Sequence, residues 1–380
     1  MKKNILVIGM LDSIHLSRWL EQFNNDDINF YLFPSKKYRK LNQNLIRIAV
    51  NSTKAQYVHH GNLGKYKYSG YVDFIKFEIL KFGSLRRKSL EKLLKNKSFD
   101  YIHAIEIQGA GYLLGSVEKI HWKKAKTILT NWGSDIFYFS RFDEHRSLIV
   151  RILQKVDFYS AECQRDYELA ANLHFEGTFL PCIPNAGGFN VEESRIDYID
   201  PDKRRQIIIK GYGGVFGRSD IPISLIENIN SEFPDFNFYL YSVTPDALKL
   251  IEKLPRHILK QTRISKSKDR LTQKDIMKEF SKSRVYIGCS ESDGISTSFL
   301  ESLVTGAYPI QTNTSCANEW ILKGAIGSLV NLDSQEILNE IRAALRDDDL
   351  VNNASLINYQ VSRKYLAKSE IEKIASEFYR

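Results

Sequence analysis

Short apolar runs alternate with longer amphipathic stretches along the chain, and this alternation limits the fold more than any other feature. The runs are rich in β-branched residues and include residues 5–8, 101–103, 127–129, 207–209 and 238–241. Runs of this kind, separated by amphipathic segments, are typical of buried parallel strands joined by crossover helices. The sequence therefore predicts an α/β fold built on parallel sheets.

The chain is long enough for two domains. At 380 residues it exceeds the size at which one hydrophobic core stops growing. Residues 181–202 have the Pro, Gly and polar composition of a linker, including the string Pro-Asn-Ala-Gly-Gly at 184–188. We therefore expect one Rossmann-like domain over residues 1–190 and a second over residues 191–358.

Several classes of protein do not fit the sequence. No run reaches the roughly 18 apolar residues that a membrane span requires, and the apolar start is interrupted at Asp12 and His15, unlike a signal peptide. The chain has 4 cysteines without CxxC spacing, so neither a zinc site nor a disulfide framework is indicated. We expect a cytoplasmic protein.

Positive charge is concentrated in the first hundred residues. They hold 19 Lys and Arg against 8 Asp and Glu, which gives this segment a net charge of +11. Because the whole chain has a net charge of +9, the remaining residues have a net charge of −2. Aromatic residues are interleaved with the basic ones between Lys36 and Lys97, and residues 74–94 read as an amphipathic helix or helix pair. This segment predicts either docking on an anionic membrane surface or a solvated basic face. No recognised motif supports nucleic-acid binding.

A turn between two carboxylates leads into a helix near residue 297. Asp293 and Glu301 lie eight positions apart, which places Glu301 about two turns into that helix. The residues between them form the turn and the helix start: Gly294, Ile295, Ser296 and Thr297. A helix start favours negative charge, and a carboxylate accepts hydrogen bonds from hydroxyls. The pattern predicts a site for a polyol beside a phosphate; the alternative is a surface helix capped by Ser296 or Thr297 with a solvated Glu301.

This segment resembles the signature of family 4 retaining glycosyltransferases of the GT-B fold. The matching residues are Asp293, Gly294, Glu301, Gly306, Pro309 and Ile310. The family usually has Glu at the first position and an aromatic residue with a second glycine in the turn, where this chain has Asp293 and Ile295-Ser296. The resemblance implies two Rossmann-like domains with parallel sheets facing a central cleft. It also implies terminal helices, over residues 359–380, that return to the first domain.

A glycine-rich loop follows the first expected strand of the second domain. Lys210 and Arg218 flank it, and it contains Gly213 and Gly214. Backbone N–H groups and two cations suit a diphosphate. A dinucleotide enzyme would place an Asp or Glu at the end of the next strand, but residues 237–241 are followed by Ser-Val-Thr. We therefore expect a diphosphate site without NAD, and the resemblance gives the same role to the basic pair.

Candidate residues in the first domain follow the expected strands. Asp12 and His15 follow the first strand, and Asp135 follows residues 127–129. His103 ends the strand near residue 102, and Glu106 lies in the loop and helix start after it. Their strings resemble those of bacterial family 4 enzymes, which implies that Asp12, His15 and His103 are on the acceptor side and that Glu106 and Asp135 take part in the reaction. Three of them have a plainer alternative: His15 as a helix-face residue, and Glu106 and Asp135 as helix caps.

The resemblance implies a retaining glycosyltransferase that moves a sugar from a nucleotide-sugar, with a UDP-sugar favoured, to a glycan or lipid-linked acceptor in bacterial surface polysaccharide synthesis. Arg218 and Lys210 would stabilise the leaving diphosphate, and no metal or other cofactor is expected. One alternative is a sugar-nucleotide epimerase, which alters the sugar without an acceptor. Another is a non-catalytic protein that binds nucleotide-sugars or a membrane surface.

Overall fold

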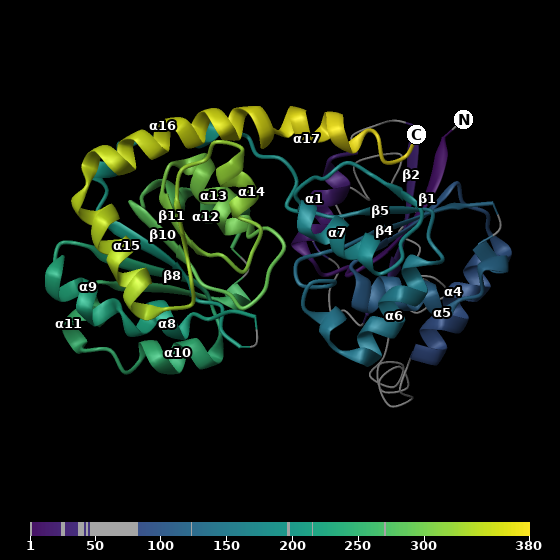
Figure 1. The fold of residues 1–380 in the computed structure, drawn as a ribbon, viewed down its shortest axis with the longest axis horizontal. Helices are drawn as coiled ribbons and strands as arrows, with labels where there is room; N and C mark the ends of the chain where they lie inside the picture. The colour runs from purple at the N-terminus through teal and green to yellow at the C-terminus, as the bar shows by residue number, and fades with distance from the viewer. Residues whose placement is uncertain are drawn as a thin grey trace. The chain divides into compact units, whose positions relative to one another are not determined.

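The computed structural model describes residues 2–23, 27–36, 42, 45, 83–122, 124–195, 198–214, 216–269 and 271–380. It divides into two compact units, residues 1–187 with 372–380 and residues 188–371. The expected division into domains over residues 1–190 and 191–358, with terminal helices over 359–380, stays a prediction. Each unit contains one parallel sheet with helices on both faces, so the predicted α/β fold is confirmed (Figure 1).

The first unit is built on a six-stranded sheet of order β2-β1-β3-β4-β5-β6. Its strands are β1 (Lys3–Gly9), β2 (Ile28–Pro34), β3 (Tyr101–Ile105), β4 (Lys126–Thr130), β5 (Phe158–Ser160) and β6 (Thr178–Phe179). The helices are α1 (Ile14–Glu21), α4 (Gly83–Asn96), α5 (Tyr112–Ser116), α6 (Asp143–Leu153) and α7 (Gln164–Asn172), with a π-helix at Ile107–Gly111. The register pairs Ile5 with Tyr101 and Ile102 with Thr127.

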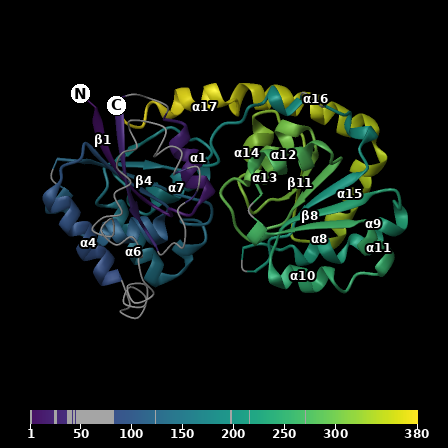
Figure 2. The same cartoon turned by 180° about the vertical axis from the view of Figure 1, so that it is seen from behind.

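Alternation along the strands of the first unit supplies two cores. Leu6 and Ile8 face one core, and Ile5 and Val7 face the other, because successive side chains of a strand point to opposite faces. Helices α4 to α7 cover the first face. Helix α1 and the C-terminal residues cover the second, at the side of the unit away from α4 and α6 (Figures 1 and 2).

The second unit has a six-stranded parallel sheet of order β12-β11-β10-β7-β8-β9. Its strands are β7 (Gln206–Lys210), β8 (Asn237–Val243), β9 (Thr262–Lys266), β10 (Val285–Gly288), β11 (Tyr308–Thr312) and β12 (Ser328–Val330). Counted within the unit, this is the strand order 3-2-1-4-5-6 of the dinucleotide-binding fold. The predicted Rossmann-like character is therefore confirmed for this unit.

Helices cover both faces of the second sheet. One core contains Ile207 and Ile209 and lies under α8 (Asp220–Ser224), α9 (Ile226–Glu232), α10 (Pro245–Ile251), α11 (Arg256–Lys260) and α15 (Ser334–Arg346). The opposite core contains Ile208 and lies under α12 (Gln273–Ser281), α13 (Thr297–Thr305), α14 (Asn318–Leu322) and α16 (Asp348–Tyr365). Helix α17 (Lys368–Ala375) follows, and the last residues, 372–380, belong to the first unit.

Most of the basic segment between Lys36 and Lys97 lies outside the described residues, so the hypothesis of a membrane-docking surface there stays a prediction. Its described helix is α4 (Gly83–Asn96), and residues 74–82 of the expected helix or helix pair lie outside the described residues. Leu90 and Leu94 of α4 are buried in the first core. That apolar stripe therefore packs inside the unit and is not available to a lipid surface.

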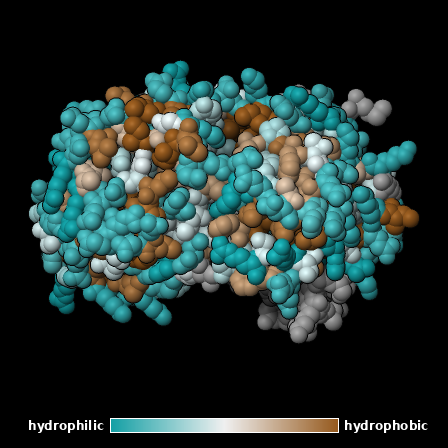
Figure 3. Space-filling view, viewed as in Figure 1, coloured by the Kyte–Doolittle hydropathy of each residue, from teal (hydrophilic) through white to brown (hydrophobic). Residues whose placement is uncertain are grey.

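In the described part of the chain, every helix is too short or too polar to span a bilayer. On the face drawn in Figure 3, exposed apolar residues occur in separate patches between hydrophilic ones. Single exposed apolar side chains such as Leu322 and Leu356 are ordinary at a protein surface.

Candidate functional site

The strand order of the second sheet reverses between β7 and β10, and the loops after these two strands lie together. An isolated antiparallel bridge joins Gly217 to Ser290. The N–H of Arg218 donates to the Cys289 carbonyl at 3.2 Å, and the N–H of Glu291 donates to the Phe216 carbonyl at 2.9 Å. Open α/β sheets bind ligands outside the carboxyl ends of their strands at such a reversal. The two loops that were predicted to hold a donor are therefore neighbours at the expected place.

Lys210 and Asp293 come together at this edge. The Lys210 Nζ lies 3.9 Å from an Asp293 carboxylate oxygen, and both side chains are about a quarter exposed, at 27% and 25%. The other Asp293 oxygen accepts a hydrogen bond from the Gly294 N–H at 2.9 Å. The structure thus brings together two predicted residues that are far apart in the sequence, and a ligand can reach both.

Arg218 already has two carboxylate partners. Its Nε and one terminal nitrogen donate to the two oxygens of Asp220, each at 3.0 Å, and the other terminal nitrogen donates to Glu291 at 2.7 Å. These hydrogen bonds raise the pKa of Arg218, with Asp220 the larger contributor. This pairing was not predicted from the sequence, because neither acid belongs to the recognised signature. The Arg218 side chain is nevertheless 32% exposed.

The glycine loop between β7 and α8 is held by the segment after β8. Gly214 has a φ of 85°, in the region that favours glycine. The Gly213 N–H donates to the Thr244 hydroxyl at 3.1 Å, and a Cβ on Gly213 would lie 2.2 Å from an Asp246 carboxylate oxygen. A side chain at position 213 would therefore displace the Asp246 carboxylate from its present place.

Asp246 corrects one expectation from the sequence. We expected no carboxylate after the second strand of this unit, but β8 runs on to Val243 and Asp246 follows it closely. Its pKa is lowered by hydrogen bonds, first from the Thr244 side chain and also from the Gly214 N–H. The carboxylate thus fastens the glycine loop, which is a different role from holding a ribose in a dinucleotide site.

Helix α13 starts where the sequence predicted, but without the Ser296 cap that belonged to the alternative of a surface helix. Ser296 occupies the N-cap position with extended dihedral angles, and its side chain makes no capping hydrogen bond. Thr297 is the first helical residue and is half-buried. Capping by Ser296 is therefore wrong, and the orphan N–H groups of the first turn are not satisfied by that hydroxyl. Glu301 is 4% exposed, so the alternative of a solvated Glu301 is also wrong.

Ile295 points away from solvent. Its side chain is 3% exposed and belongs to the core beneath α13. Only the backbone of Ile295 can therefore face a ligand. The Gly294 carbonyl accepts a hydrogen bond from the Cys316 N–H at 2.7 Å, which ties the turn to the loop after β11.

Glu106 begins the π-helix in the first unit. It has a φ of 76°, and its carboxylate accepts hydrogen bonds from the N–H groups of Gly109 and Ala110, each at 2.7 Å. Burial raises the pKa of Glu106, and those two hydrogen bonds oppose the shift. The structure therefore shows the capping geometry that was one of the two expectations for this residue.

Asp135 lies beside Glu106 on the loop after the neighbouring strand β4. One Asp135 carboxylate oxygen accepts hydrogen bonds from the N–H groups of Ile107 at 2.7 Å and Trp132 at 3.1 Å. Burial raises the pKa of Asp135 well above its usual range, and the charge of Glu106 adds to the effect. The alternative of an ordinary helix cap is wrong for Asp135, because turns rather than a helix follow it. The two carboxylates form a coupled pair, in which each charge disfavours the other.

Three further candidates of the first unit lie in different surroundings. Asp12 is exposed, and His15 is half-buried with its ring edge-on to Trp132 at a centroid distance of 6.0 Å. His103 is fully buried: its ring nitrogens bond the Tyr379 hydroxyl at 2.7 Å and the Thr130 hydroxyl at 2.6 Å. Burial lowers the pKa of His103 to about 3. A contact between His103 and an acceptor would have to break these bonds, so the geometry gives it a structural role.

Glu162 of the first unit was not among the residues predicted from the sequence. This buried carboxylate follows β5 and accepts hydrogen bonds from the N–H groups of Gly133 at 3.1 Å and Asn185 at 3.2 Å. The signal was available, because the short run Phe158–Ser160 reads as a strand and a polar residue after a parallel strand lies at the ligand edge.

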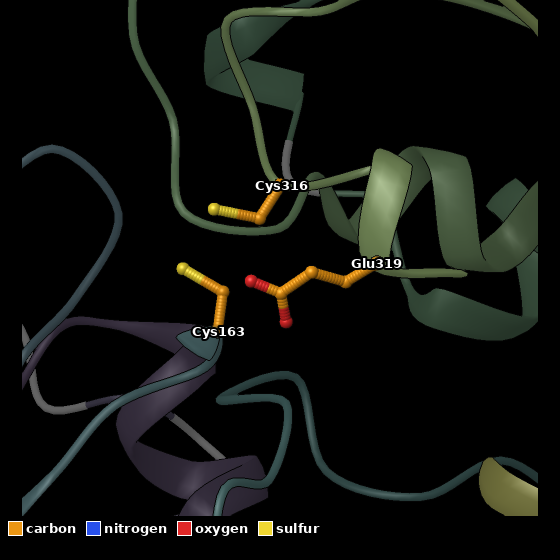
Figure 4. Close-up of side chains that lie close together, drawn as sticks. All are labelled: Cys163, Cys316 and Glu319. Carbon is orange, nitrogen blue, oxygen red and sulfur yellow. The ribbon is translucent and has the colours of Figure 1, made fainter. Parts of the chain in front are cut away.

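Figure 4 labels three potential metal ligands. Cys316 lies before α14 and Glu319 within it, both in the second unit, whereas Cys163 belongs to the first unit. We argue no metal site from them.

Comparisons with known proteins concern the sequence family of the first unit and the fold of the chain. Residues 4–162 match the family model described as "Glycosyl transferase 4-like". A search of curated protein sequences found no significant match. The solved structures that resemble the chain include Anabaena HepE in complex with UDP, at 14% identity and a TM-score of 0.69, with 99% of each chain covered.

Two other solved structures show the same fold. A variant of S. aureus TarM in complex with fondaparinux, α-GlcNAc-glycerol and UDP has 10% identity and a TM-score of 0.72, with 100% of each chain covered. The pneumococcal O-GlcNAc transferase GtfA, in complex with UDP and GlcNAc, has 14% identity and a TM-score of 0.62 over 77% of this chain and 60% of that chain. The chain thus has the GT-B fold of these glycosyltransferases. Residues 4–162 of its first unit match the sequence pattern of the glycosyl transferase 4-like family.

Proposed function

We propose that the protein is a retaining glycosyltransferase that binds a nucleoside diphosphate sugar, with UDP as the favoured nucleotide, on its second unit. The observation that carries the proposal is the meeting of Lys210 and Asp293 at the strand-order reversal, between a glycine loop and the uncapped start of α13. The UDP in the complexes of HepE, TarM and GtfA supports the choice of nucleotide.

The donor residues divide by charge. Lys210, Arg218 and the backbone of Gly213 and Gly214 offer positive charge and N–H donors to the diphosphate. Asp293, Glu301, Thr297 and the backbone of the Gly294-Ile295-Ser296 turn offer acceptors and donors to the hydroxyls of ribose and sugar. The two cations supply the charge that a metal ion provides in other transferases.

The acceptor half of the proposal rests on Glu106 and Asp135. Because their charges disfavour each other, the pair holds one proton more readily than two isolated carboxylates do. Such a pair can hydrogen-bond an acceptor hydroxyl and take up its proton as the new bond forms. His15 and Asp12, on the loop and helix after β1, are proposed to contact the remainder of the acceptor.

The reaction separates charge at the diphosphate. As the bond between the sugar and the diphosphate breaks, negative charge grows on the leaving phosphate oxygen, and the sugar becomes oxocarbenium-like. Donors already aimed at that oxygen stabilise the transition state without reorganisation. We propose that the acceptor is a glycan or lipid-linked sugar of a bacterial surface polysaccharide, and that the protein acts at the cytoplasmic side of the membrane.

An Arg218→Ala variant tests the proposal. Removing one well-aimed donor costs about 10² to 10³ in rate in comparable sites, so we expect a loss of this size in UDP-sugar-dependent transfer. Arg346→Ala is the matched control, because Arg346 is also paired with a carboxylate, Glu232 at 3.0 Å, but lies on α15 and is 64% exposed. The rate of the control should stay near that of the wild type.

Product analysis separates the proposal from its rivals. Transfer that is unchanged in both Arg218→Ala and Glu301→Gln would contradict the donor site. Conversion of the sugar without any acceptor would instead indicate an epimerase. Binding with neither hydrolysis nor transfer, over a panel of glycan and lipid-linked acceptors, would indicate a non-catalytic binding protein.

A further inference from the structure

Two buried tyrosines lie beneath the first turn of α13. Tyr241 is on β8 and Tyr286 is on β10, the strands on either side of β7. Their rings are 4% and 0% exposed and pack against Phe280 of α12 at centroid distances of 5.7 and 5.3 Å. Packing in the core requires only the rings, whereas a buried hydroxyl also requires a hydrogen-bond partner.

Both hydroxyls meet the residues that start α13. The Tyr241 hydroxyl donates a short hydrogen bond to the Ser298 hydroxyl. The Tyr286 hydroxyl donates to the Gln311 side-chain oxygen at 3.2 Å and lies 3.5 Å from the Ser296 hydroxyl. Burial raises the pKa of both tyrosines, so both remain protonated donors across the physiological range.

Gly288 leaves the space that the Tyr286 hydroxyl occupies. A Cβ at this last residue of β10 would lie 2.1 Å from that hydroxyl and 2.5 Å from the Gln311 oxygen. The Glu301 carboxylate is close enough to Tyr241 to raise the pKa of that tyrosine further. The same polar cluster therefore touches the start of α13 and its second turn.

We propose that Tyr241 and Tyr286 are positioning residues of the donor site, which hold the first turn of α13 through Ser298 and Ser296. Ser296 is a residue type that normally caps a helix, yet its hydroxyl faces Tyr286 and makes no capping bond. The arrangement fixes the turn from Asp293 to Thr297 and the place of Glu301 without touching the ligand. This inference rests on the proposed function.

Tyrosine-to-phenylalanine variants test the role of the hydroxyls, because they keep the rings and remove only the oxygen. Tyr241→Phe and Tyr286→Phe should each weaken UDP binding by about 3- to 10-fold, the effect of losing one hydrogen bond, in calorimetric titration. The KM for the UDP-sugar should rise by a similar factor, while the KM for the acceptor stays constant.

Tyr239→Phe is the matched control. Tyr239 lies on the same strand and face as Tyr241, is 5% exposed, and donates its hydroxyl to Ser265 of β9 at 3.0 Å rather than to α13. All three variants lose a buried hydroxyl, so we expect similar decreases in unfolding temperature. Only the variants beneath α13 should lose affinity.

The outcomes separate the two proposals. If the wild type binds UDP and Tyr241→Phe and Tyr286→Phe bind it as tightly as Tyr239→Phe does, the positioning role is overturned and the proposed function stands. If the wild type binds none of UDP, GDP and ADP, the proposed function fails and this inference fails with it. A third outcome is that only one of Tyr241→Phe and Tyr286→Phe binds UDP more weakly, while Tyr239→Phe is unchanged. This result supports the positioning role for the tyrosine whose variant is weakened and overturns it for the other tyrosine.

Discussion

At the scale of single residues, burial decides what the ionisable side chains can do. His103 lies within β3, two residues before its end, and Asp135 follows β4; the sequence predicted site residues at both places. His103 is enclosed with both ring nitrogens bonded, so burial lowers its pKa to about 3. Asp135 is half-buried beside Glu106, and its pKa is raised. The sequence identified both positions but not these environments, because burial depends on segments from elsewhere in the chain, such as Tyr379.

The buried neutral His103 predicts a pH dependence of stability. Its pKa is lower in the folded state than the 6.5 of a free histidine, so the unfolded chain binds the proton more readily. The contribution of neutral His103 to the free energy of unfolding is complete above pH 6.5, and it is lost progressively as the pH falls towards 3. Between pH 7 and pH 5 this loss is about 2 kcal/mol.

Urea denaturation at pH 7 and pH 5 measures this effect. Tryptophan fluorescence reports mainly on the first unit, which contains Trp19, Trp122 and Trp132. In His103→Gln the difference between the two pH values should shrink by about 2 kcal/mol. A difference equal to that of the wild type would show that His103 is already protonated in the folded protein at pH 5.

At the scale of elements, strands were more predictable than helix ends and loops. The runs 5–8, 101–103, 127–129, 207–209 and 238–241 all lie within strands, because short buried strands need continuous apolar residues. At the start of α13, the sequence offered Ser296 as a cap, but its side chain makes no capping hydrogen bond. The pairing of Arg218 with Asp220 and Glu291 depends on loops that meet only in three dimensions.

The end of α13 allows a prediction about stability. Gly306 has a φ of 80°, and a Cβ there would lie 2.2 Å from the Ser355 hydroxyl of α16. Gly306→Ala should lower the free energy of unfolding by about 1 to 3 kcal/mol through strain and crowding. Gly324→Ala is the control for strain alone, since Gly324 has a φ of 99° but its Cβ would meet only Val361, at 3.9 Å. Hydrogen exchange of β10 and β11 amides should show the larger decrease for Gly306→Ala, and equal decreases would exclude the contact with Ser355.

At the scale of the whole molecule, the chain returns to its first unit at the C-terminus. Phe378 is 2% exposed and packs on Trp19 of α1 at a centroid distance of 5.0 Å, and the Tyr379 carbonyl accepts a hydrogen bond from Lys3. The family resemblance predicted such a return, whereas the composition and periodicity of the sequence did not predict it. Sequence patterns report local structure, and a tail that docks far from its neighbours in the chain leaves no local signal.

Removal of this anchor should destabilise one unit selectively. Phe378→Ala should cost about 3 to 5 kcal/mol, as for other buried aromatic residues, and should lower hydrogen-exchange protection in β1 and β3. The amides of β7 and β10 should keep theirs, because they belong to the other unit. Glu377→Ala, at an exposed neighbouring position, is the control. Equal loss of protection in both sheets would show that the units unfold as one.

The central claim is that the edge of the second sheet, at Lys210 and Asp293, binds a nucleoside diphosphate. The most direct measurement is the unfolding temperature with UDP, for the wild type, Lys210→Ala and Lys203→Ala. Lys203 is an exposed lysine of the same unit, paired with Asp200 at 2.6 Å. UDP at about 100 times its dissociation constant should stabilise the wild type by about 2.7 kcal/mol. Lys203→Ala should keep this shift and Lys210→Ala should lose most of it; no shift in the wild type, or an equal shift in all three proteins, would contradict the claim.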